Sequence, residues 1–321
     1  MNYRLGIDLG GTKILMLLVN EQEEIVGEEK VYTRASDGPE RIISYLLTAA
    51  DNFMVKNNIP PQNLEGIGVC VAGFYHYPSG KMISSPNLPN WDDFPLKNKL
   101  EEGFSCPVLV ENDANAAAFG EYTWGAGKGK RNVFLFTLGT GIGGGIVNDG
   151  QIYRGEGGFA GEIGHLPLIP GGELCGCGKR GCLETISSGR AIEREAQEIL
   201  SSPFPTVLKD LTNEVEIKAS HVFNAAEMGD EEAKKIINRA AYYLGLGLTS
   251  AVNLINPDII IAAGGLSQNK RTFWEKVLSY IENHAVYASV RNLDLIPAAL
   301  GEAAGAKGMV ALLEGKNHIK K

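Results

Sequence analysis

The feature that most limits the possible folds is a strand–turn–strand unit that occurs twice. Each copy has an apolar strand, a glycine-rich turn with a threonine, and a second apolar strand; the copies cover residues 5–19 and 133–147. Their separation of about 130 residues is too long for a solenoid repeat, whose period is about 20–50 residues. The duplication therefore predicts an α/β protein of two lobes, with one glycine hairpin in each.

Each glycine turn has two interpretations. Because glycine lacks a Cβ atom, the backbone can approach a ligand closely, and successive N–H groups can bind a phosphate. The alternative is an ordinary hairpin turn. Two such turns, one in each half, favour a nucleotide held by both. Neither is a Walker A loop, which needs Gly-x4-Gly-Lys-Ser/Thr before a helix.

Hydrophobic periodicity predicts both helices and strands along the rest of the chain, which is mostly helical after the cysteines. Helices are expected over residues 37–58, 114–124, 189–199, 219–228, 231–255, 271–286 and 302–314, and strands over 66–72, 108–110, 259–263 and 294–296. Residues 73–91 are rich in turn-forming residues and are predicted to be irregular. No stretch has the composition of a flexible linker, so short connections between the lobes are expected.

The composition favours a globular protein of about two domains. The chain has 321 residues, 44% of them hydrophobic, and a formal charge of −8, which argues against nucleic acid or a membrane surface as a partner. No apolar run approaches the roughly 20 residues that span a bilayer, and Met1 leads into a strand without signal-peptide features. Five cysteines, an odd number, indicate reduced thiols or metal ligands. We therefore expect a cytoplasmic protein.

Two polar or glycine-rich segments follow predicted strands, where α/β sheets bind their ligands. Asn112 and Asp113 come after residues 108–110, and either they cap the next helix or they place a carboxylate at a binding site. Gly264 and Gly265 follow residues 259–263, and they form either a close-packed turn or a second approach of the backbone to a nucleotide. The residues alone leave both alternatives open.

Three of the five cysteines and one histidine predict a metal site, with the spacing His165-x9-Cys175-x-Cys177-x4-Cys182. Three thiolates and an imidazole suit tetrahedral Zn²⁺ and leave no open position, so the site should be structural. The alternative is a disulfide, but a bridge between Cys175 and Cys177 would be strained.

The predicted metal site would bring two carboxylates together. Glu162 lies three residues before His165, and Glu184 lies two residues after Cys182. His165 can bind metal through one ring nitrogen and offer the other to a ligand. These groups could bind several hydroxyls; the alternative is that both glutamates are ordinary solvated surface residues.

Taken together, these motifs resemble the ROK family of bacterial sugar kinases and repressors, and the similarity covers nearly the whole chain. Residues 183–191 look most like ROK glucokinases. The motifs that carry the resemblance are Asp8-Leu9-Gly10-Gly11-Thr12-Lys13, Glu111-Asn112-Asp113-Ala114-Asn115, residues 138–145, Glu162 with His165, Cys175-Gly176-Cys177-Gly178 with Cys182-Leu183-Glu184, and Asn256-Pro257-Asp258 followed by Gly264-Gly265.

The resemblance implies an α/β fold of the two-lobed actin-like, hexokinase type, with duplicated ribonuclease H-like lobes and a zinc knot. It implies a small N-terminal lobe of residues 1–115 plus 301–321 and a large C-terminal lobe of residues 116–300 that carries the zinc motif. By the same analogy a homodimer is expected.

The activity that the resemblance implies is ATP-dependent phosphorylation of a hexose, most simply glucose at its 6-hydroxyl. Asp113 would be the general base, and ATP, Mg²⁺ and a structural Zn²⁺ would be the cofactors. The sugar would be bound by Gly73, Asn87, Asn112, Asp113, Glu162, His165 and Glu184. The nucleotide and Mg²⁺ would be bound by Asp8, Gly10, Gly11, Thr12, Lys13, Gly139, Thr140, Gly141, Gly143, Gly144, Gly264 and Gly265, and zinc by His165, Cys175, Cys177 and Cys182.

One departure from the family pattern affects the choice of sugar. Many relatives have Pro-Gly where this chain has Ala72-Gly73, followed by Phe74-Tyr75-His76. Kinases for N-acetylmannosamine, N-acetylglucosamine or fructose are therefore the alternatives. A sugar-sensing ROK repressor is disfavoured because the first motif begins at Asp8, which leaves no room for an N-terminal helix-turn-helix. A polymerising actin-like protein would have no use for the predicted zinc knot.

Overall fold

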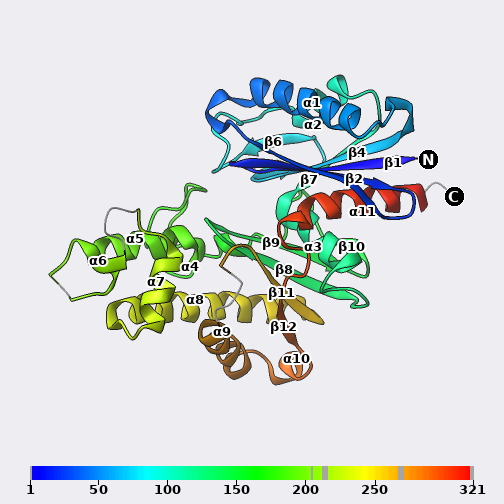
Figure 1. The fold of residues 1–321 in the computed structure, drawn as a ribbon. Helices are drawn as coiled ribbons and strands as arrows, with labels where there is room; N and C mark the ends of the chain where they lie inside the picture. Colours follow the sequence, from blue (N-terminus) through cyan, green and yellow to red (C-terminus); the bar gives the residue numbers. More distant parts are fainter. Residues whose placement is uncertain (1, 204, 212–215, 267–270, 319–321) are drawn as a thin grey trace. The chain divides into compact units, whose positions relative to one another are not determined.

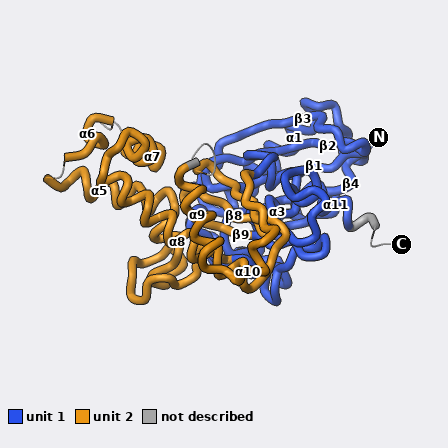
Figure 2. The backbone as a smooth tube through the Cα atoms, turned by 90° about the horizontal axis from the view of Figure 1, so that it is seen from below, with its two compact units in different colours: residues 1–133, 145–161, 298–321 blue, residues 134–144, 162–297 orange. Residues whose placement is uncertain are grey.

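A computed structural model describes the chain except residues 1, 204, 212–215, 267–270 and 319–321. Two compact units result, one of residues 1–133, 145–161 and 298–321 and the other of residues 134–144 and 162–297 (Figure 2). The lobes predicted from the sequence differ from these units in residues 116–133, 145–161 and 298–300, which belong to the first unit. The lobe boundaries themselves stay a prediction.

The first unit is built on a five-stranded sheet with helices on both faces (Figure 1). The β1–β2 and β2–β3 pairs are antiparallel, and the β1–β4 and β4–β7 pairs are parallel, so the predicted first glycine hairpin is confirmed. Helices α1 and α2 lie on one face of the sheet and α3 and α11 on the other. The strand order is β3(Ile25–Tyr32)-β2(Lys13–Asn20)-β1(Tyr3–Leu9)-β4(Leu64–Val71)-β7(Val108–Asn112), and the helices are α1(Pro39–Lys56), α2(Leu96–Gly103), α3(Asp113–Trp124) and α11(Ala304–His318), with 3₁₀ turns at Ala35–Asp37, Pro61–Asn63 and Gly301–Ala303.

Part of the segment predicted to be irregular forms a small hairpin. Strands β5(Phe74–His76) and β6(Lys81–Ser84) pair antiparallel, so the prediction for residues 73–91 was wrong there. Strands of three and four residues are too short to show a period-two pattern, although Tyr75 and Met82 are both buried. The hairpin begins directly after Gly73, which has a φ of +127° that favours glycine.

The second unit is centred on another five-stranded sheet, flanked by long helices. Its order is β10(Gln151–Ile152)-β9(Ile142–Asn148)-β8(Asn132–Leu138)-β11(Ile259–Ala263)-β12(Asp294–Pro297), with β11 and β12 parallel; the end of β9 and all of β10 are counted with the first unit. The helices are α4(Glu184–Ser187), α5(Gly189–Leu200), α6(Leu208–Leu211), α7(Ala219–Glu227), α8(Glu231–Ile255), α9(Arg271–His284) and α10(Tyr287–Val290), with a 3₁₀ turn at Ile163–His165. None of the helices in the described ranges combines the length and the apolar character needed to cross a bilayer.

Small residues let α3 and α11 pack unusually closely in the first unit. A Cβ atom at Gly308 would lie 1.8 Å from the carbonyl oxygen of Ala116, and one at Gly120 would lie 2.4 Å from that of Ala304. Since both neighbours are backbone atoms, neither can move aside without shifting a helix. The Ala/Gly-rich sequence of α11 is therefore a packing requirement of this unit.

We expect Gly308→Ala to lower the free energy of unfolding by about 3 kcal/mol or more, because the added methyl group forces the two helices apart. Gly315→Ala in the same helix is the matched control, since a Cβ atom there meets nothing within 4 Å. That change should raise stability by up to ~1 kcal/mol through helix propensity. Urea unfolding followed by circular dichroism measures both; equal effects of the two substitutions would contradict the packing explanation.

Candidate active site

Two carboxylates lie near the carboxyl ends of the first unit's parallel strands. Asp8 is in β1, opposite Cys70 of β4 in the parallel register, and Asp113 begins α3 after β7. Burial, together with the negative charge of Asp113, raises the pKa of Asp8 to about 7. Burial also raises the pKa of Asp113 to about 6, although hydrogen bonds from the Ala114 backbone and Asn112 act against the increase. Asp8 and Asp113 thus form an interacting pair that titrates near neutral pH.

Asn112 fixes the start of α3, as the capping interpretation predicted. Its Oδ1 accepts from the backbone N–H groups of Ala114 (2.9 Å) and Asn115 (3.1 Å). Its Nδ2 donates to the carbonyl oxygen of Gly73 at 3.1 Å, and Asp113 Oδ1 accepts from the Ala114 N–H at 2.9 Å. The structure therefore brings Gly73, Asn112 and Asp113 together, and capping does not exclude a functional role for them.

The first glycine turn lies against another predicted site residue. The Gly10 N–H donates to the Lys13 carbonyl at 3.0 Å, and a Cβ atom at Gly11 would lie 2.7 Å from the Asn87 carbonyl oxygen. Asn87, expected at the sugar, thus contacts the turn expected at the phosphates. The carbonyl of Thr12 accepts from the backbone of Thr33, and the Lys13 ammonium pairs with Glu302 at 2.7 Å.

The predicted metal ligands converge in the second unit. The ligand atoms of His165, Cys175, Cys177 and Cys182 all lie within 4.8 Å of one another. Cys175 Sγ is 3.4 Å from His165 Nδ1, and Cys177 Sγ is 3.7 Å from Cys182 Sγ. A disulfide bond is about 2.05 Å long, so the disulfide alternative is wrong for these thiols. The cluster could hold one metal ion.

Glu162 and Glu184 lie on opposite sides of the His165 imidazole. His165 Nε2 is 3.8 Å from Glu162 Oε2, and His165 Nδ1 is 3.8 Å from Glu184 Oε1. The Cys175 thiol also donates to Glu184 Oε1 at 2.9 Å. With 28% and 18% of their side chains exposed, the two glutamates are not ordinary solvated surface residues. The prediction that the cluster gathers both carboxylates is confirmed as geometry.

The second glycine loop contacts Glu184 and the Gly264 turn. The Ile142 N–H donates to Glu184 Oε2 at 3.4 Å, and a Cβ atom at Gly141 would lie 2.8 Å from the same oxygen. Gly264 has a φ of +91°, and a Cβ atom there would lie 2.4 Å from the Leu138 carbonyl oxygen. The Gly264 turn therefore lies against Leu138, directly before the second glycine loop, whose predicted nucleotide residues are Gly139, Thr140, Gly141, Gly143 and Gly144; Gly265 follows in the turn.

Two charged residues beside Asn112 were not singled out from the sequence. Arg154 Nε donates to Glu111 Oε2 at 2.6 Å, and Glu111 is 1% exposed. A charged residue in an otherwise apolar strand end was the available signal for Glu111. Its partner lies 43 residues later, which no local pattern reveals.

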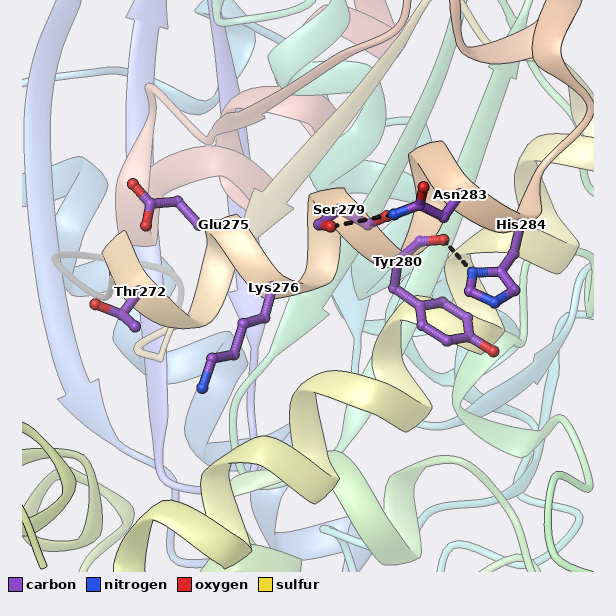
Figure 3. A pocket seen from close by; sticks show the side chains of 7 residues that line it. All are labelled: Thr272, Glu275, Lys276, Ser279, Tyr280, Asn283 and His284. Carbon is purple, nitrogen blue, oxygen red and sulfur yellow. Dashed lines mark hydrogen bonds between the residues drawn. The ribbon is translucent and has the colours of Figure 1, made fainter.

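An open pocket of about 360 Å³ lies along α9 and contains none of the predicted site residues (Figure 3). Some of its polar groups bond within the helix. His284 Nδ1 lies 2.8 Å from the Tyr280 carbonyl oxygen, and the imidazole stacks on the Tyr280 ring with the centroids 3.9 Å apart. Lys276 Nζ instead bonds to Asn238 of α8.

Comparison with known proteins identifies the family. The model of the ROK family matches residues 4–316. The chain belongs to the ROK family. Among its relatives in this family, the glucokinase of Halalkalibacterium halodurans is 39% identical over 95% of this chain and 92% of the relative. The xylose repressor of Bacillus subtilis is 31% identical over 97% of this chain and 77% of the relative.

A solved ROK structure supports the same assignment of the fold. The ROK family glucokinase from Streptomyces griseus, in complex with glucose and AMPPNP, matches 98% of this chain with a TM-score of 0.79 and 34% identity. The predicted two-lobe, hexokinase-type α/β fold is therefore confirmed.

We expect Asp8→Asn to stabilise the protein at alkaline pH. Because the folded-state pKa of Asp8 is raised to about 7, wild-type stability falls as the pH rises from about 4 through 7. Asparagine has no proton to lose, so its stability should not fall in this way. Relative to wild type, the free energy of unfolding of the variant should be higher by on the order of 1–3 kcal/mol at pH 8 and by little at pH 4. Urea unfolding at several pH values measures the difference, with Asp51→Asn, an exposed residue of α1, as control. A gain that does not change with pH would contradict the explanation.

Proposed function

We propose that this protein transfers the γ-phosphoryl group of ATP to the 6-hydroxyl of a hexose, with glucose as the preferred acceptor. The observation that carries the proposal is the half-buried Asp113 carboxylate, which is held at the start of α3 beside Asn112 and has a pKa of about 6. The identity to a relative named glucokinase and the likeness to a ROK glucokinase structure containing glucose and AMPPNP support it.

In this proposal Asp113 is the general base. With a pKa of about 6 it is mostly ionised at pH 7–8 yet remains basic enough to accept the hydroxyl proton as the oxygen attacks phosphorus. Phosphoryl transfer needs positioning and charge neutralisation more than covalent help, so one base contributes about 10²–10⁴-fold. Asn112 and the Ala114 N–H hold the carboxylate in place.

The sugar-binding groups in the proposal are Gly73, Asn87, Asn112, Asp113, Glu162, His165 and Glu184. Carboxylates accept from hydroxyl groups, whereas amide and imidazole N–H groups donate to them. His165 Nδ1 lies beside the Cys175 sulfur, which leaves Nε2, on the side of Glu162, as the nitrogen available to a sugar.

The nucleotide would be bound by the two glycine turns, by Lys13 and by the Gly264–Gly265 turn. Mg²⁺, when bound with ATP, neutralises charge on the phosphates, and Asp8 is the proposed protein carboxylate near it. A cation there would also lower the pKa of Asp8, which burial and Asp113 raise.

Zinc is the proposed metal of the Cys₃His cluster. Sulfur atoms about 2.3 Å from a tetrahedral zinc ion lie about 3.8 Å apart, close to the 3.7 Å between the Cys177 and Cys182 sulfurs. Four protein ligands leave no position for a reactant, so zinc would supply structure rather than catalysis. The ligand residues would then fix Glu162, His165 and Glu184 in one orientation.

The alternatives differ in which sugar is the substrate and in whether the bound sugar is phosphorylated. Kinases for N-acetylmannosamine, N-acetylglucosamine or fructose would share the same base, and a sugar-sensing repressor would bind without turnover. The homodimer expected from the resemblance and the cytoplasmic location expected from the composition stay predictions.

The test is a panel of glucose, mannose, fructose, N-acetylglucosamine and N-acetylmannosamine, scored by kcat/KM with ATP and Mg²⁺. We expect glucose to give the highest value, and a rate for glucose that falls below about pH 6 as Asp113 becomes protonated. Higher activity on an N-acetylated sugar would reassign the substrate. Binding of a sugar without turnover of any would contradict the kinase proposal.

Asp113→Asn is the control for this test. The amide keeps the size of the side chain and cannot accept the proton, so kcat should fall about 10²-fold or more while the Kd for glucose changes little. Near wild-type turnover in this variant would exclude Asp113 as the base.

Metal analysis of the purified protein should find about one zinc per chain. Cys177→Ser should lose the metal, lower the Tm and raise the KM for glucose more than the KM for ATP. Cys106→Ser, a free thiol outside the cluster, is the matched control and should keep the metal. A zinc-free protein with undiminished stability and activity would refute the proposed site.

A further inference from the structure

Glu111 is a buried carboxylate whose hydrogen bonds converge on the start of α3. Its Oε1 accepts from the Asn112 backbone N–H at 3.0 Å and from Asn115 Nδ2 at 3.1 Å, and its Oε2 accepts from Arg154 Nε at 2.6 Å. Only 1% of Glu111 is exposed. A charge buried this deeply needs a partner, and Arg154 is the cation that pairs with it.

Arg154 makes a second contact on a different segment. Its guanidinium lies 4.3 Å from the centroid of the Tyr77 ring, within the range of a cation–π interaction. The Tyr77 N–H donates to the Gly157 carbonyl at 3.0 Å, and the Ala160 N–H donates to the Arg154 carbonyl at 3.0 Å. Residues 154–160 are thus folded back on themselves and attached to Tyr77.

These contacts form a closed ring of residues that includes Asn112. From Arg154 the ring passes through Glu111 to Asn112, whose Nδ2 donates to Gly73 at 3.1 Å. From Gly73 the chain runs through β5 to Tyr77, which packs on Arg154. Arg154 therefore contacts both Glu111, the residue before Asn112, and Tyr77, which β5 connects to Gly73.

We propose that Arg154 is a positioning residue for phosphoryl transfer: through Glu111 and Tyr77 it holds Asn112 and Gly73 in register with the Asp113 carboxylate. The inference rests on the proposed function of Asp113. Arg154 does not touch the reacting atoms. It acts because the pair neutralises a charge two residues before the base, and because a misplacement of about 1 Å in a reacting geometry can cost about 10²-fold in rate.

The ion pair predicts charge compensation between two variants. Arg154→Met removes the cation and leaves the Glu111 carboxylate buried without it, so kcat/KM for glucose should fall about 100-fold. Adding Glu111→Gln removes the unpaired charge but keeps an oxygen that accepts from Asn112 and Asn115. The double variant should therefore recover about tenfold over Arg154→Met alone, a non-additivity that independent sites would not show.

The experiment measures kcat and KM for glucose and for ATP, with Tm, in wild type, Arg154→Met, Arg154→Lys, Glu111→Gln and the double variant. Arg131→Met is the matched control, because Arg131 forms an exposed pair with Asp149 and its loss should change kcat/KM less than twofold. Arg154→Lys keeps the charge, so it should fold and fall between wild type and Arg154→Met. The KM for ATP should change less than threefold throughout.

Three results would overturn the inference: no loss in Arg154→Met, no recovery in the double variant, or a rise of more than threefold in the KM for ATP that matches a rise in the KM for glucose. If Arg154→Met does not fold, Arg154→Lys is compared with and without Glu111→Gln instead. Wild-type activity in Arg154→Lys would then overturn the inference. The proposed function fails separately, when the wild-type protein phosphorylates no hexose or Asp113→Asn retains turnover.

Discussion

The close contact between α11 and the strands β1 and β4 determines the environment of the Asp8 carboxylate. A Cβ atom at Gly305 would lie 2.9 Å from both Asp8 Oδ2 and Cys70 Sγ, and one at Gly6 would lie 2.1 Å from the Ala306 carbonyl oxygen. Only a helix of small residues can approach a sheet so closely. The approach removes water from Asp8, and this desolvation is the main cause of its raised pKa. The close packing of α11 on the sheet and the raised pKa of Asp8 therefore have the same cause, the small residues of α11.

The two units fix their polar groups by different means. In the first, Asn112 and Asp113 stand between a parallel strand and a helix, so backbone hydrogen bonds position them. In the second, residues 162–183 contain one short 3₁₀ turn and isolated bridges such as Pro167–Cys182, and turn-type backbone hydrogen bonds such as Cys175 N–H to the Lys179 carbonyl shape the segment. The Cys₃His cluster lies in this segment, where a bound metal would add its own bonds to these.

Local sequence patterns predicted the features of the structure that are determined by residues close together in the chain. Helix α8, strand β11 and the Asn112 cap follow from periodicity and capping, and the clustering of the four predicted metal ligands follows from their spacing. The convergence of Glu162 and Glu184 followed from folding the chain onto those ligands. The β5–β6 hairpin was missed because its strands are very short. The Arg154–Glu111 pair was missed because it depends on tertiary contact between residues 43 positions apart.

The hydrogen bonds of Asn112 limit how it could contact a sugar. A primary amide offers two N–H groups and two acceptor positions. Oδ1 accepts from Ala114 and Asn115, and Nδ2 donates to Gly73. Three of the four positions are therefore in use by backbone groups, and both acceptor positions are taken. A hydroxyl that binds Asn112 while the cap of α3 is kept must do so at Nδ2, by accepting from it, because Oδ1 is occupied by α3.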